Sequence, residues 1–123
     1  MGKVERFEDL KCWQQARILV KEIYLLAEDG KLSKDYDTKS QIKRAALSVM
    51  NNIAEGFGKF SNKEFIHYLD IAHNSVSEVK SILYVLGDLN YISEEKAKQL
   101  QNKTDEIKAM TLAFIKYLTS RNK

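Results

Sequence analysis

Apolar residues recur every three or four positions in four segments of the chain, a spacing that places them on one face of an α-helix. The predicted helices span residues 9–28, 38–57, about 61–87 and about 93–119. The stripe of the first consists of Trp13, Ala16, Leu19, Val20, Ile23, Leu26 and Ala27. Each helix therefore carries one apolar face that must be buried against the others.

Residue types typical of helix starts stand in front of these segments. Asp9 is the expected N-cap of the first helix, and Ser93 precedes the last. Ser61 and Glu64 have the spacing of a capping box. Because the connections are short, we predict an all-α fold in which residues 1–123 form one antiparallel, up-down-up-down four-helix bundle. The last two helices should be longer than the first two, which leaves some apolar surface for a partner chain.

The composition agrees with a small helical domain. The chain has 123 residues, no proline and five glycines, so residues that interrupt helices are scarce. One cysteine excludes an internal disulfide and fits a reducing compartment. No apolar run approaches the ~18 residues of a membrane span, and the first residues lack the apolar core of a signal peptide. These features predict a cytoplasmic protein with no membrane partner.

Charge is more informative in its distribution than in its total, which is only +3. Folding the chain as a bundle gathers cations at the end that holds both termini and the connection near residue 60. We call this the basic end: Lys3, Arg6, Lys11, Lys59, Lys63, Lys116, Arg121 and Lys123, against Glu5, Glu8, Asp9 and Glu64. The opposite end collects Glu28, Asp29, Asp35, Asp37, Asp88, Glu94 and Glu95 against Lys31, Lys34, Lys39, Lys96 and Lys98.

The basic end has two interpretations. It attracts phosphate backbones, with Phe57, Phe60 and Tyr117 nearby to stack on bases. Alternatively, its cations only complement the dipoles of helix C-termini. For one chain the charge excess is modest, and a ring of subunits would multiply it.

A polar stripe flanks the apolar face of the second predicted helix. It consists of Arg44, Ser48, Asn51, Asn52 and Glu55. One interpretation is a solvated face. The other is a polar network buried between helices or subunits, in which Arg44, Asn52 and Glu55 satisfy one another or meet Ser75 and Glu78, because buried charges require such partners.

Candidate catalytic chemistry is weak. Glu64-x-x-His67 and Asp70-x-x-His73 have the spacing of a di-iron motif, but both lie on one helix and no other helix supplies a histidine. No histidine is fixed beside Cys12, and paired carboxylates occur only as sequence neighbours, which point apart on a helix. We therefore expect no metal site, no cofactor and no enzymatic activity.

Several stretches of the chain resemble a known family. They are residues 7–13, 41–58, 63–72 and 75–78, of which Asn52 to Gly56, Asn-Ile-Ala-Glu-Gly, is the most specific. Together they resemble the four-helix bundle proteins encoded in intervening sequences of bacterial 23S rRNA genes. The match departs at Met50, where the family has proline, and at Glu78-Val79-Lys80, where Glu-Leu-Glu is commoner.

The resemblance implies a bundle that assembles into a homopentameric ring. A related protein, the accessory protein of diversity-generating retroelements, is basic and binds nucleic acid and a reverse transcriptase. Arg44, Asn52, Glu55 and Gly56 match family positions, and their role would be structural.

These observations lead to two functional hypotheses. The first is a non-enzymatic, oligomeric binding protein that contacts RNA or DNA phosphates through Lys59, Lys63, Lys116 and Arg121. The second is a protein–protein interaction scaffold with no affinity for nucleic acid. Binding measurements distinguish the two.

Overall fold

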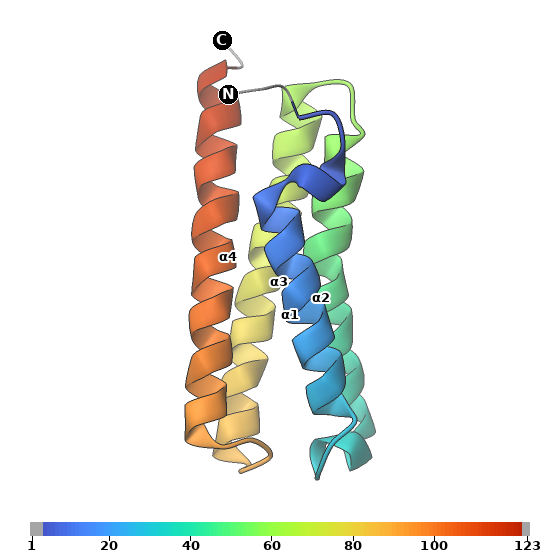
Figure 1. Cartoon of the computed structure of the whole chain (residues 1–123), viewed down its shortest axis with the longest axis vertical. Helices are drawn as coiled ribbons and strands as arrows, with labels where there is room; N and C mark the ends of the chain where they lie inside the picture. The colour runs from blue at the N-terminus through green and yellow to red at the C-terminus, as the bar shows by residue number, and fades with distance from the viewer. Residues whose placement is uncertain (1–3, 122–123) are drawn as a thin grey trace.

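The computed structural model describes residues 4–121 and contains four α-helices (Figure 1). They are α1 (Lys11–Ala27), α2 (Tyr36–Phe57), α3 (Asn62–Asp88) and α4 (Glu94–Arg121). Residues 4–121 contain no strand, so the predicted all-α bundle is confirmed. In Figure 1 each helix runs opposite to the one before it, and the α2–α3 connection lies at the same end as the start of α1 and the end of α4.

The sequence pattern predicted the relative lengths of the helices correctly, but it did not predict where the first helix begins. As predicted, α3 and α4, with 27 and 28 residues, are longer than α1 and α2, with 17 and 22. The expected N-cap at Asp9 is wrong, because Phe7–Asp9 forms a separate 3-10 turn and α1 is preceded by Leu10 in an extended conformation. The Phe7 ring packs edge-on against Trp13, with 5.2 Å between centroids, and this tertiary contact holds the turn.

Side-chain caps define the starts of the other three helices. The Ser61 hydroxyl accepts a hydrogen bond from the Glu64 N–H at 3.2 Å, and Ser93 does the same for Lys96 at 3.0 Å. Asp35 caps α2 by accepting from the Thr38 N–H at 3.2 Å. Each bond satisfies a backbone donor that the helix leaves unpaired.

Asp35 also joins the α1–α2 and α3–α4 connections, at the end of the bundle opposite the basic end. The Tyr91 hydroxyl, in the α3–α4 connection, donates to Asp35 Oδ2 at 3.0 Å. The hydrogen bonds from Thr38 and then from Tyr91 hold the pKa of Asp35 below its usual value. The same carboxylate raises the pKa of Tyr91, so the phenol stays protonated and remains a donor.

The core runs through the bundle between all four helices. Its largest fully buried side chains on the helices are Leu19, Ile23, Ile42, Val49, Ile53, Leu69, Val76, Leu83, Leu86, Leu100 and Ile107. Burying each such side chain contributes roughly 1.5–3 kcal/mol to folding. The buried hydroxyls of Thr104 and Thr111 donate to the carbonyls of Gln101 and Lys108, at 2.6 and 3.0 Å. None of the helices in the described chain combines the length and apolar character needed to cross a membrane.

Candidate functional site

The end of α2 approaches the start of α3 very closely at Gly56. A Cβ atom added to Gly56 would lie 2.6 Å from Tyr68 Cβ and 2.9 Å from Phe65 Cδ1. Side chains do not pack at such distances, so only glycine permits this spacing. Gly56 therefore acts sterically, by setting where the following connection, which carries Lys59 and Phe60, sits on α3.

Aromatic rings join three helices beneath this connection. Phe57 packs edge-on against Phe65, with 5.9 Å between ring centroids, and Phe65 packs edge-on against Phe114 at 5.1 Å. Tyr117 continues the series, 6.5 Å from Phe114. Edge-to-face pairs stabilise such clusters beyond the burial of their area. Phe57 is thus part of the packing between α2 and α3, and its stacking on a ligand stays a prediction.

Lys59 and Lys63 face a shared shallow hollow of about 800 Å³, which Tyr68 of α3 and Ile115 of α4 also line. The ammonium group of Lys59 lies 5.0 Å from the centre of the Tyr68 ring. Such a cation–π contact restrains the long side chain without neutralising its charge. The hollow therefore offers positive charge beside an aromatic ring.

The four cations predicted to bind phosphate are available for a ligand. Lys59, Lys63, Lys116 and Arg121 are all exposed, and within residues 4–121 none of them forms an ion pair with a carboxylate. The guanidinium of Arg121 lies 5.8 Å from the Tyr117 ring. Lys59 and Lys63 share the hollow, whereas Lys116 and Arg121 do not line it.

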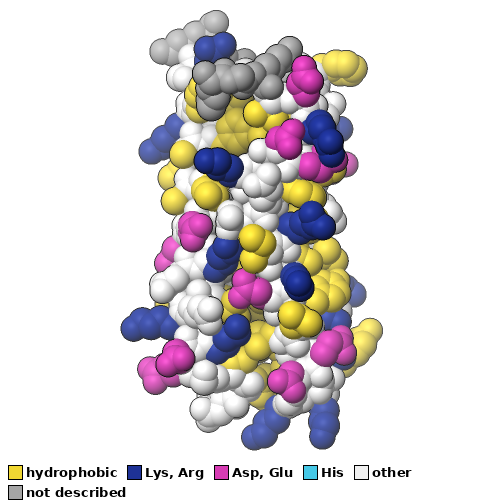
Figure 2. Space-filling view, viewed as in Figure 1, with side chains coloured by type: hydrophobic (Ala, Val, Ile, Leu, Met, Phe, Trp, Pro, Cys, Tyr) yellow, Lys and Arg dark blue, Asp and Glu magenta, His cyan; other side chains and the backbone are white. Residues whose placement is uncertain are grey.

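The positive charge at this end of one chain is nevertheless small. Six of its cations and four carboxylates lie in the described part, and Lys3 and Lys123 lie outside it. Arg6 is neutralised by Glu8 at 2.9 Å, and Glu64 and Asp70 line the hollow itself. On the face drawn in Figure 2, basic and acidic side chains alternate along the bundle.

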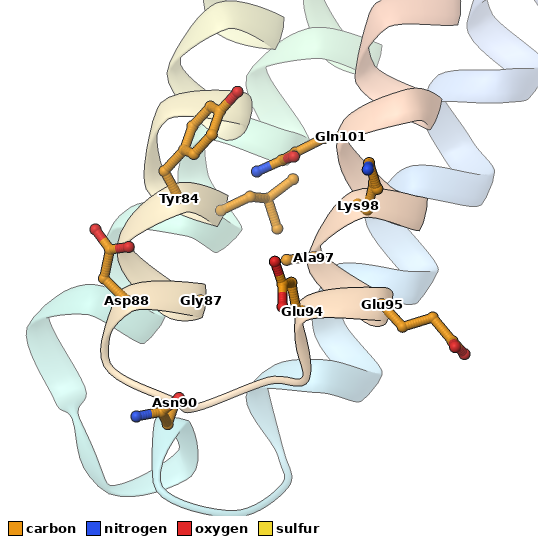
Figure 3. A pocket seen from close by; sticks show the side chains of 10 residues that line it. Tyr84, Gly87, Asp88, Asn90, Glu94, Glu95, Ala97, Lys98 and Gln101 are labelled. Atoms are coloured by element: carbon orange, nitrogen blue, oxygen red, sulfur yellow. The ribbon is translucent and has the colours of Figure 1, made fainter.

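The opposite end has a second hollow, between the last turns of α3 and the first turns of α4 (Figure 3). Tyr84, Asp88, Glu94, Glu95 and Lys98 are among the residues that line it. Figure 3 shows the Glu95 carboxylate turned away from the hollow. Three carboxylates and one ammonium line this hollow. The whole end carries seven carboxylates against five lysines, a small excess of the opposite sign, so the described chain is electrically polar.

In the structure, the polar stripe on α2 separates into a hydrogen-bonded set and a set of exposed charged residues. Ser48 and Ser75 hydroxyls lie 2.8 Å apart between α2 and α3, and the Asn52 amide donates to the Ser48 carbonyl and hydroxyl at 2.8 and 3.0 Å. Within residues 4–121 no buried side-chain nitrogen or oxygen lacks a hydrogen-bond partner, those of this compact set included.

The charged members of the stripe behave differently. Arg44, Glu55 and Glu78 are exposed, and within the described chain none of them forms an ion pair. Within one chain the expected network of these charges is therefore wrong, because the short side chains of Ser48 and Ser75 close the helix contact without them. Arg44 and Glu78 face a common groove, and a pairing between copies of the chain stays a prediction.

The remaining candidate reactive groups, the Cys12 thiol and the His73 imidazole, take part in the packing of the bundle. Burial raises the pKa of the Cys12 thiol to about 11, which leaves it protonated at neutral pH. His73 Nδ1 lies 3.0 Å from the Thr111 hydroxyl, linking α3 to α4. In residues 4–121 no three His, Cys, Asp or Glu side chains gather as metal ligands.

Comparisons with known proteins point to one family. Residues 8–113 match the sequence model of the family described as 23S rRNA-intervening sequence protein. A crystal structure of a protein of unknown function from the S23 ribosomal protein family, from Bacteroides thetaiotaomicron, has a TM-score of 0.78 at 25% sequence identity. That match covers 85% of this chain and 98% of the other. No curated protein matches the chain.

Proposed function

The chain belongs to the 23S rRNA-intervening sequence protein family, and from this premise we propose that it is a non-enzymatic, oligomeric protein that binds the phosphate backbone of RNA or DNA. Its basic end makes the contact, through Lys59, Lys63, Lys116 and Arg121. The protein acts in the cytoplasm, and the assembly that the family resemblance implies is a pentamer.

One observation carries this proposal: the four cations at the basic end have no carboxylate partner in the described chain. Lysine and arginine side chains that are exposed and unpaired can neutralise phosphates, and the release of counterions then favours binding. Arg121 lies near the exposed ring of Tyr117, Lys59 lies over Tyr68, and Phe60, which follows Lys59 in sequence, is fully exposed. This combination of cations and rings is typical of surfaces that bind nucleic acid without reading a base sequence.

Oligomerisation strengthens the proposal, because a single chain has only a small positive excess at this end. Each added subunit contributes another set of unpaired cations, and the number of neutralised phosphates grows with the assembly. Affinity then depends steeply on salt, since each phosphate contact adds about 0.7–0.9 to the logarithmic slope.

The test is a double substitution, Lys59→Gln with Lys63→Gln. The matched control is Lys31→Gln with Lys34→Gln, because these lysines are also exposed and lie near the α1–α2 connection at the opposite end. We expect the first variant to bind a labelled oligonucleotide more weakly, with a flatter salt dependence, and the control to bind like the wild type. Equal affinity of the two variants removes Lys59 and Lys63 from the site.

A protein–protein scaffold is the second candidate, and the outer face of α1 favours it. Ile18 and Leu25, one heptad apart, are 45% and 63% exposed and line a shallow, largely apolar hollow on this helix. A scaffold predicts no affinity for nucleic acid even at low salt. It also predicts that Ile18→Ser with Leu25→Ser changes the mass of the particle or its capture of a partner protein.

A further inference from the structure

Phe60 is unusual among the apolar side chains because its ring is fully exposed. Its relative exposure is 106%, whereas Tyr36, the next most exposed large apolar residue in the described chain, reaches 73%. Phe57, three residues earlier, is packed against Phe65. An exposed phenylalanine forgoes the favourable burial of its ring. The Phe60 ring therefore contributes nothing to the core of one chain and is free to contact a ligand.

The connection that carries Phe60 is held in place on both sides. The Gly58 and Lys59 N–H groups bond to the carbonyls of Glu55 and Gly56, at 3.2 and 3.1 Å. On the other side, Ser61 caps α3. The ring is therefore presented from a short connection between two helix ends, and binding would order few additional residues.

Cations lie on both sides of the ring in sequence. Lys59 immediately precedes it and is restrained over Tyr68, and Lys63 follows three residues later in the first turn of α3. One short connection thus carries an exposed ring and two exposed cations, the two kinds of group with which proteins bind the bases and the phosphates of a single strand. In a duplex, by contrast, the base faces are already stacked, and inserting a ring costs the energy of unstacking them.

We infer that the α2–α3 connection binds single-stranded nucleic acid, with one unpaired base stacked on Phe60 and the flanking phosphates bound by Lys59 and Lys63. The inference rests on the proposed function and makes it more specific, because it names the strand state of the ligand. It assigns affinity for a backbone to the lysines and preference for a single strand to the ring.

The test compares Phe60→Ala with the wild type on a 12-nucleotide single strand and on a duplex of the same sequence. Stacking contributes about 1–3 kcal/mol per base, so Phe60→Ala should bind the single strand roughly 5- to 150-fold more weakly. Its salt dependence and its affinity for the duplex should stay unchanged. Tyr36→Ala, which removes an exposed ring at the opposite end, is the matched control and should bind both ligands normally.

A second variant, Phe60→Trp, reports on stacking directly. The indole at this position should be quenched by the single strand and not by the duplex, while the buried Trp13 gives a constant background. An unquenched indole at saturation with single strand overturns the inference. So does a blue shift with anionic vesicles, or with a partner protein, when oligonucleotides leave the emission unchanged.

The two proposals fail in different ways. If Lys59→Gln with Lys63→Gln weakens binding and Phe60→Ala does not, the stacking inference is wrong and the proposed function stands. If the wild-type protein binds neither single strand nor duplex at low salt, the proposed function is wrong and the inference falls with it.

Discussion

Replacing Gly56 by alanine tests how closely α2 and α3 approach beneath the candidate site. At an open helical position, glycine to alanine stabilises a protein by roughly 0.5–1 kcal/mol, because the unfolded chain loses freedom. At Gly56 the new methyl group would lie 2.6 Å from Tyr68 Cβ, far inside the 3.4–4 Å of ordinary contact. Tyr68 Cβ is fixed to the α3 backbone, so the helices must separate.

Inserting a methylene into a packed contact costs about 1–3 kcal/mol, which exceeds the helical gain. We expect Gly56→Ala to lower the free energy of unfolding by about 1–2 kcal/mol, which lowers Tm by roughly 3–10 °C for a chain of this size. Thermal unfolding followed by circular dichroism at fixed protein concentration measures the change. Gly87→Ala is the matched control, because its Cβ would meet only Ala97 Cβ, at 3.7 Å, and should keep or raise Tm. A rise in Tm for both variants would refute the close approach.

Three further predictions follow from single side chains. Glu55→Ala should change the free energy of unfolding by less than about 0.5 kcal/mol in urea titrations, because the carboxylate is exposed and unpaired within the described chain; a loss of several kcal/mol would indicate a buried pairing between subunits. Cys12, whose pKa burial raises to about 11, should resist a thiol reagent at pH 8 in the folded protein and react on unfolding, so rapid native labelling contradicts its burial. The pKa of Asp35 is lowered in the folded chain, so its stabilising contribution is present above the unfolded pKa and is lost as pH falls through the folded pKa. Asp35→Asn should therefore lose less Tm than the wild type as the pH is lowered. An unchanged fall of Tm at acid pH in the variant would contradict this role.

The helices could be predicted from the sequence because their apolar spacing is a local property. The lengths of α3 and α4, and the caps at Ser61 and Ser93, follow from residues within a few positions of each helix end. The start of α1 could not be predicted in the same way. Asp9 has the right chemistry for a cap, but the contact between Phe7 and Trp13 favours a 3-10 turn instead.

The residue types of the candidate site could be predicted from the sequence, but the exposure of each side chain could not. Phe57 and Phe60 look equivalent in the sequence, three positions apart in a basic segment. One ring is packed against Phe65 and the other is fully exposed, because α2 ends between them. Gly56 likewise looks like an ordinary helix-end glycine, and only the position of α3 reveals its steric role.

The polar stripe on α2 shows the same limit. Helical spacing places Arg44, Ser48, Asn52 and Glu55 on one side of the helix, but it does not predict which of them faces α3. That choice depends on how the helix is rotated about its axis, which is set by packing along its whole length. The structure brings Ser48 against Ser75 of α3, with Asn52 donating to Ser48, and leaves the charged residues in solvent.

Nucleic-acid binding by the basic end is tested most directly by titrating the protein with a labelled rRNA fragment and a single-stranded DNA at two salt concentrations. The mass of the particle is measured in the same buffer. We expect a particle of several subunits whose affinity falls steeply as salt rises, because several phosphates are neutralised at the summed basic ends. Absence of binding at low salt, whatever the particle mass, would contradict the proposed nucleic-acid function and favour the protein scaffold.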